Sequence, residues 1–118
     1  MGPEAKFYQN VKQNFRQFSL IRLENISVLG TPDLLVYNTS GHFFTIELKL
    51  NLAKKIRFSP HQIGFHIKHP HNSFIMAKGL CQRDIKLYEG SKIRDLVSGS
   101  AEPCAVGMMS SFKFLQKV

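Results

Sequence analysis

The sequence predicts a mixed α/β domain with a helix, a three-stranded antiparallel meander, a second helix, a further strand and a small C-terminal extension. Three observations support this fold class. Apolar residues recur at helical spacing in residues 3–18, apolar and polar residues alternate in residues 42–50, and a helix-start signature occupies residues 59–62. These two periodicities distinguish an amphipathic helix from a strand that is buried on one face.

The composition indicates a single basic domain over residues 1–118, with a core at about residues 4–79 and the extension at about residues 80–118. Hydrophobic residues make up 43% of the chain, and the formal net charge is +8. This charge favours a polyanionic partner. No apolar run is long enough to span a membrane and no signal peptide is recognisable, so we expect a cytoplasmic protein without a membrane partner. Cys81 and Cys104 lack the spacing of a metal site.

Residues 3–18 are predicted to form the first helix. Its inward stripe consists of Phe7, Val11, Phe15 and Phe18. Glu4 lies three residues before Phe7 and therefore shares this stripe. It is either a first-turn acid that complements the helix dipole or an acid that reaches a carboxylate cluster on the sheet.

Residues 19–29 are predicted to form the first strand. Arg22 and Glu24 share one face and could form an ion pair there. Alternatively, Glu24 competes with Glu4 as the additional acid of a metal site, and Arg22 contacts phosphate. Gly30 ends the strand and permits the turn that follows.

Residues 30–37 and 42–50 predict two strands joined by the polar turn 38–41. In the second strand, Glu47 and Lys49 point to one face, while the apolar residues point to the other. Asp33 opens the first strand after a proline, and strand pairing would bring it beside Glu47. Two carboxylates and an amine then converge at one end of the hairpin.

Two close carboxylates repel each other unless a proton or a cation lies between them. Oxygen ligands of this kind suit Mg²⁺ or Mn²⁺. The alternative is structural. On an exposed strand, Glu47 and Lys49 would be a solvated pair and Asp33 would only start a turn.

Residues 51–58 contain three cations and no acid: Lys54, Lys55 and Arg57. This stretch is either a solvated loop or an edge that contacts phosphates. Ser59 and Gln62 then form a capping box, which explains their spacing without catalysis. The second helix should run to about residue 69.

In this second helix we expect Ile63 and Ile67 to be buried and Gly64 to permit close packing. Four histidines lie in or near it: His61, His66, His69 and His71. They lack the paired ligand spacing of a zinc site. We therefore expect these histidines to lie on the surface or to face DNA.

Residues 73–78 and 84–89 predict two more strands, and residues 91–97 a short helix with Ile93, Leu96 and Val97 inward. Residues 98–102 read as a loop. The tail to residue 118 is apolar for an exposed end, so it either packs on the core or forms a dimer contact.

Four motifs follow one another in a characteristic order: Gly-Thr-Pro-Asp at 30–33, the hairpin, Glu-Leu-Lys at 47–49 and Ser-Pro-His-Gln at 59–62. This arrangement resembles the PD-(D/E)XK nuclease superfamily, and within it the VRR-NUC and Holliday-junction-resolvase-like branch that is common in phages. The resemblance covers about residues 4–79 and implies a restriction-endonuclease-like core.

The resemblance implies a Mg²⁺-dependent endodeoxyribonuclease, with Mn²⁺ as a substitute, that acts on branched DNA as a homodimer without a small-molecule cofactor. The setting it implies is the cytoplasm of a bacterial or phage-infected cell. It places the metal on Asp33, Glu47 and the Leu48 carbonyl, with Glu4 as a further ligand. Lys49 would orient the attacking water or stabilise charge on the phosphate, with Gln62 close by.

The residues expected to contact DNA are Arg22, Lys54, Lys55, Arg57 and Ser59. Three other functions fit the same sequence. One is a phage homing or nicking endonuclease, another is a nucleic-acid-binding module without catalysis, and the third is a basic structural protein that assembles through its apolar tail. Metal-dependent cleavage separates the nucleases from the other two.

Overall fold

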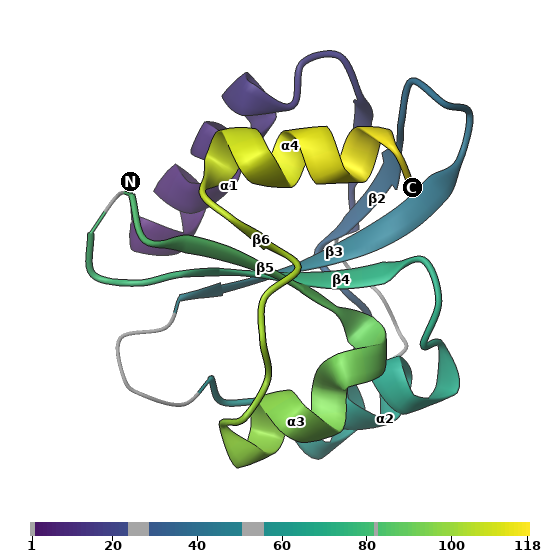
Figure 1. The fold of residues 1–118 in the computed structure, drawn as a ribbon, viewed down its shortest axis with the longest axis vertical. Helices are drawn as coiled ribbons and strands as arrows, with labels where there is room; N and C mark the ends of the chain where they lie inside the picture. The colour runs from purple at the N-terminus through teal and green to yellow at the C-terminus, as the bar shows by residue number, and fades with distance from the viewer. Residues whose placement is uncertain (1, 24–28, 51–55, 82) are drawn as a thin grey trace.

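The computed structural model describes residues 2–23, 29–50, 56–81 and 83–118. Six strands form one mixed sheet whose spatial order follows the chain, β1 to β6. The helices lie in two layers, with α1 and α4 on one face of the sheet and α2 and α3 on the other (Figure 1). The elements are α1 Pro3–Asn14, β1 Ser19–Arg22, β2 Leu34–Tyr37, β3 Phe43–Leu50, α2 Pro60–Lys68, β4 Ser73–Lys78, β5 Ile85–Glu89, the short 3₁₀ helix η1 Gly90–Lys92, α3 Ile93–Ser98, β6 Ala105–Val106 and α4 Met108–Gln116.

The first helix is shorter than the sequence predicts, because α1 ends at Asn14. The N–H of Phe15 still bonds the Val11 carbonyl, and a tight turn then bonds the Phe18 N–H to the Phe15 carbonyl. All four residues of the predicted stripe are nevertheless buried. The turn keeps Phe15 and Phe18 inside, where their rings contact that of Phe112 on α4 at centroid distances of 5.6 and 4.8 Å.

The predicted hairpin is present, with β2 and β3 antiparallel and Leu34 opposite Ile46. The amide of Asn38, in the turn, is buried and satisfies several backbone groups. Its oxygen accepts from the N–H groups of Ser40 and His42, at 3.1 and 2.9 Å, and its nitrogen donates to the Leu115 carbonyl at 2.9 Å. One side chain thus ties the hairpin turn to the end of α4.

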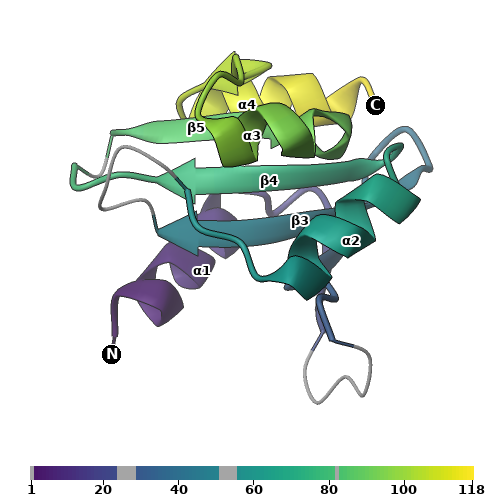
Figure 2. The same ribbon diagram turned by 90° about the horizontal axis from the view of Figure 1, so that it is seen from below.

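Strand β4 runs parallel to β3, with Glu47 opposite Ile75. A parallel pair requires a crossover connection, and α2 provides it. Figure 2, seen from the side of α2 and α3, shows these helices in front of the strands. The larger apolar cluster lies between the sheet and α1 with α4, and the smaller one contains Ile75, Tyr88, Ile93 and Leu96.

The C-terminal extension of the prediction is an integral part of the sheet. Strand β5 pairs with β4 and β6 pairs with β5, so residues 80–118 complete the same layer. The apolar tail forms α4 and packs on the core, with Leu115 fully buried. The predicted inward position of Val97 is wrong, because this side chain is 42% exposed beyond the last buried turn of α3. Within the described residues, no helix is long and apolar enough to cross a membrane.

Candidate active site

Asp33 and Glu47 lie side by side at the open end of the hairpin. The β2–β3 register pairs Leu34 with Ile46, so one further step places Asp33 opposite Glu47. Oδ2 of Asp33 accepts a hydrogen bond from the N–H of Leu48 at 2.7 Å. The Asp33 carboxylate thus accepts a backbone hydrogen bond that a carbonyl of a paired strand would normally accept. This bond holds it against β3, the strand that carries Glu47.

Glu47 is buried rather than solvated, since only 1% of the residue is exposed. Its two oxygens face different cationic or polar partners. Oε2 lies 3.8 Å from Nζ of Lys49, and Oε1 lies 3.5 Å from Nε2 of His66. Neither oxygen makes a hydrogen bond to the described residues. Since buried carboxylates normally have full sets of partners, this one has capacity left for a ligand.

Lys49 is held by the start of helix α2. Its Nζ donates to Oε1 of Gln62 at 2.8 Å and lies 4.9 Å from the ring centre of Phe58. The same Gln62 oxygen accepts from the N–H of Ser59 at 2.9 Å, and the Ser59 hydroxyl accepts from the N–H of Gln62 at 3.2 Å. The predicted capping box is therefore present, and its glutamine also contacts the candidate catalytic amine.

Burial raises the pKa of the Asp33 carboxyl above its ordinary value of 3.8, although the residue as a whole remains exposed. The hydrogen bond from Leu48 lowers this pKa, and the neighbouring charge of Glu47 raises it again. Lys49 has a smaller lowering effect. Two like charges in a partly desolvated place are the arrangement that a bound cation relieves.

Glu4 is exposed at the start of α1, yet its charge also raises the pKa of Asp33, so it belongs to the same electrostatic neighbourhood. Among the described residues, no three His, Cys, Asp or Glu side chains come together as a metal-holding group. Glu24, the rival for this role, lies outside the described residues. The site contains two adjacent carboxylates, of which Glu47 has orphaned oxygens, and this oxygen chemistry fits Mg²⁺, which keeps several waters of its own.

The residues predicted to contact DNA are dispersed. The guanidinium of Arg22 lies over the ring of Tyr8 at 4.6 Å on the outer strand β1. Arg57 is exposed just before α2, and Ser59 is occupied by its capping bonds. Lys54 and Lys55 lie outside the described residues.

The prediction that His66 lies on the surface or faces DNA is wrong, and its place beside Glu47 was missed. His66 is fully buried on α2, whereas the predicted interior residue Ile67 is 45% exposed and Gly64 faces open space. The helix is rotated by about one residue from the orientation that its isoleucines suggested, and Ile63 is only partly buried. Position 66 is one turn after Gln62, and this spacing on one helix face is the signal by which sequence analysis could have found it. The other clustered histidines are exposed, as expected: His61, His69 and His71.

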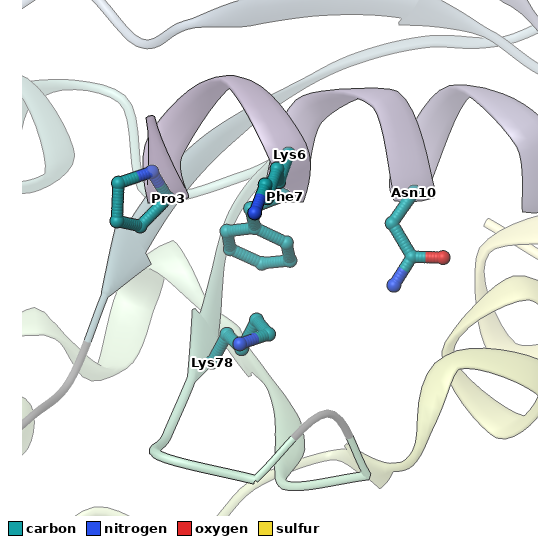
Figure 3. Close-up of a pocket in the computed structure, with 5 residues that line it drawn as sticks. All are labelled: Pro3, Lys6, Phe7, Asn10 and Lys78. Atoms are coloured by element: carbon teal, nitrogen blue, oxygen red, sulfur yellow. The ribbon is translucent and has the colours of Figure 1, made fainter. Parts of the chain in front are cut away.

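A second polar feature is a pocket of about 160 Å³ between α1 and the end of β4. It is lined by Pro3, Lys6, Phe7, Asn10 and Lys78. Figure 3 shows the two lysines and the asparagine amide around the ring of Phe7. Two amines at the mouth of one hollow favour an anion.

Exposed apolar side chains gather on β1, the end of β2 and the start of β3, toward the outer β1 side of the sheet and on the face that also carries Glu47. Ile21, Tyr37 and Phe43 are 47%, 41% and 53% exposed, and the register places Tyr37 opposite Phe43. The rings of Tyr37 and Phe43 contact each other at 4.6 Å. We call these three residues the outer-strand apolar face.

No family model matches this chain, and no curated protein matches it. Among solved structures, the chain is similar to Archaeoglobus fulgidus Hjc, a Holliday junction resolvase from an archaeal hyperthermophile. The TM-score is 0.56 at 14% sequence identity, and the match covers 74% of this chain and 77% of that chain. The likeness is one of fold, and it confirms the predicted class of mixed α/β domain with a nuclease-like architecture.

Proposed function

We propose that this chain is a Mg²⁺-dependent DNA endonuclease that cuts branched DNA such as a four-way junction, with Mn²⁺ as a substitute. The observation that carries the proposal is the buried carboxylate of Glu47, which makes no hydrogen bond to the described part of the chain and lies beside Asp33 and Lys49. The fold shared with a Holliday junction resolvase supports the choice of substrate. The resemblance of the motifs to the VRR-NUC branch agrees with it.

The roles follow from the contacts. Asp33, Glu47 and the Leu48 carbonyl would hold the metal, with Glu4, whose charge acts on Asp33, as a proposed further ligand. When bound, Mg²⁺ lowers the pKa of a water and polarises the phosphate. Asp33 is kept in place by the Leu48 N–H. Lys49, held by Gln62, stabilises the negative charge that develops on the phosphate oxygens.

The competing function is a nucleic-acid-binding module that keeps the fold without cutting. A module of that kind gains nothing from a buried acid whose oxygens make no hydrogen bond to the residues that the structure describes, because such a group lowers the stability of the domain. A phage homing or nicking endonuclease would use the same site on a different substrate. The substrate panel below separates these functions.

DNA would reach the site across a positively charged surface. Arg22 on β1 and the exposed Arg57 before α2 would each contribute a cation, and the sequence alone nominates Lys54 and Lys55 as further phosphate contacts. The pocket with Lys6 and Lys78 adds a place for a backbone phosphate near the N-terminus of α1. Such contacts position the duplex without reading its sequence.

A four-way junction has near two-fold symmetry, so a homodimer would place one site on each of two arms. The outer-strand apolar face is the surface we propose for the contact between two copies, because it continues directly from the site. Phe43→Glu should then convert a dimer into a monomer in light scattering after size exclusion, while Val106→Glu, at the exposed far edge of the sheet, should not. A wild-type monomer at high micromolar concentration overturns the dimer.

The test of the function is incubation with labelled duplex, single strand, flap and four-way junction in Mg²⁺, Mn²⁺ or EDTA. Glu47→Gln removes the charge at constant shape, and Glu102→Gln on an exposed loop is the matched control. We expect metal-dependent cuts, symmetric in the junction, that are lost only in Glu47→Gln. Binding of the junction without cleavage in either metal would favour the binding module.

A further inference from the structure

The strongest unexplained feature is a buried polar chain that runs from Ser73 through His66 to Glu47. His66 is 0% exposed and Ser73 is 2% exposed. A Cβ on Gly90 would lie 2.6 Å from the Ser73 hydroxyl and 3.0 Å from Nδ1 of His66, so the packing leaves no room beside them. A polar pair this deep in the domain normally has its hydrogen-bonding groups satisfied, yet Nε2 of His66 makes no hydrogen bond to the described residues.

The contacts determine which ring nitrogen carries the proton. Nδ1 of His66 lies 2.7 Å from the Ser73 hydroxyl, which can donate or accept. Nε2 faces Oε1 of Glu47 at 3.5 Å, and an ionised carboxylate can only accept. The contact with Glu47 is attractive only if Nε2 bears hydrogen. In the tautomer with hydrogen on Nε2, Nδ1 accepts from the Ser73 hydroxyl, so the serine favours that tautomer.

The two oxygens of Glu47 are thereby distinguished. Oε1 faces His66 on α2, and Oε2 faces Lys49 on its own strand. A turn of the carboxylate plane away from this position would move both oxygens away from Lys49 and His66, whereas a half turn only exchanges two equivalent oxygens. The group is therefore held in one orientation before any ligand arrives.

We infer that His66 is a positioning residue that orients the Glu47 carboxylate for metal binding, and that Ser73 sets the His66 tautomer. This inference rests on the proposed function. Neighbouring groups that orient a metal ligand are typically worth about 10–100-fold in metal affinity or activity. His66 itself touches neither metal nor DNA in this role.

Two substitutions of His66 separate its two contacts. Gln places an amide N–H near the position of Nε2, so His66→Gln keeps a donor toward Glu47. Asn reaches only to the position of Nδ1, so His66→Asn keeps the Ser73 contact and loses the donor. We expect His66→Gln to bind Mn²⁺ within about threefold of wild type and His66→Asn to bind it about 10–100-fold more weakly.

Mn²⁺ binding is measured without DNA, from the electron paramagnetic resonance signal of free Mn²⁺, and melting in EDTA checks the fold. Ser73→Ala and Thr45→Val are a second pair that decides the question if His66→Asn does not fold. Thr45 pairs with Ser73 in register, and its buried hydroxyl has no hydrogen-bond partner among the described residues. We expect weaker Mn²⁺ binding for Ser73→Ala and unchanged binding for Thr45→Val.

Equal Mn²⁺ affinity in His66→Asn and His66→Gln overturns the inference, as does wild-type affinity in Ser73→Ala. Both results leave the nuclease intact if wild type still binds Mn²⁺ and cuts DNA. A wild-type protein that neither binds Mn²⁺ nor cuts DNA refutes the proposed function itself. The two failures are therefore distinguishable.

Discussion

Replacing Gln62 should separate its structural role in α2 from its contact with Lys49. Its Oε1 accepts from the Ser59 N–H and from Nζ of Lys49, at 2.9 and 2.8 Å. Gln62→Ala removes both bonds. A lost capping bond costs about 1 kcal/mol, and a lost bond to a charged group costs about 1.5 kcal/mol. For a chain of this length, the sum lowers the melting temperature by roughly 10 °C.

Gln62→Glu should leave the melting temperature within about 3 °C of wild type, because Glu suits the third position of a capping box and the first helical turn. Its carboxylate would, however, form an ion pair with Lys49 and add negative charge beside Glu47. We therefore expect cleavage to fall at least about 10-fold, as for loss of a charge-stabilising contact. Circular dichroism melting in EDTA and single-turnover cleavage of a labelled junction measure the two effects.

The control for added charge is Gln9→Glu, at an exposed position of α1, which should cut and melt like wild type. Cleavage by Gln62→Glu at the wild-type rate would show that Gln62 is only a helix cap and that Lys49 works without it. An unchanged melting temperature in Gln62→Ala would refute the energetic reasoning.

Two further predictions follow from the charges. Because the folded chain raises the pKa of Asp33, it binds this proton more tightly than the unfolded chain, so stability falls as pH rises through the interval between the two pKa values. Asp33→Asn should therefore have a higher melting temperature than wild type at pH 7 in EDTA, and this difference in melting temperature should vanish below pH 3.8. Cleavage should be lost. A melting temperature below that of wild type at pH 7 contradicts this reasoning. The double variant Lys6→Ala/Lys78→Ala should reduce the slope of log affinity against log salt for DNA by about 1.8, from about 0.9 per phosphate contact. Lys92→Ala/Lys113→Ala, with the same charge change at exposed sites, should leave the slope close to wild type, and equal slopes for both pairs would exclude the pocket as a phosphate contact.

The hairpin and its acids were predictable because a strand has only two faces. Once alternation places Glu47 and Lys49 together, the turn at residues 38–41 determines the register and brings Asp33 opposite Glu47. The capping box was predictable because it is a local interaction within four residues. The burial of Glu47 was not predictable from the sequence. An alternating strand has the same sequence pattern whether its polar face contacts water or a helix.

The orientation of α2 was harder to predict, because a nine-residue helix with scattered apolar positions has no dominant face. Ile67 looked like the interior residue, but the interior is decided by what the helix covers, and here it covers a carboxylate. His66 is a better partner for that group than an isoleucine. The C-terminal strand β6 has only two residues, too few for a period, and α4 was visible only as an apolar tail.

The hydrogen bond between Asn38 and the end of α4 has a consequence for synthesis of the chain on the ribosome. Asp33 and Glu47 lie at the open end of the hairpin. Its closed end is hydrogen-bonded to α4, through residues that are 77 positions apart in the chain. A nascent chain therefore contains every candidate catalytic side chain long before Asn38 can bond to α4. The aromatic residues beneath α4 are also uncovered until then. We expect emergence of α4 from the ribosome, rather than emergence of the acidic residues, to determine when the candidate site is first assembled.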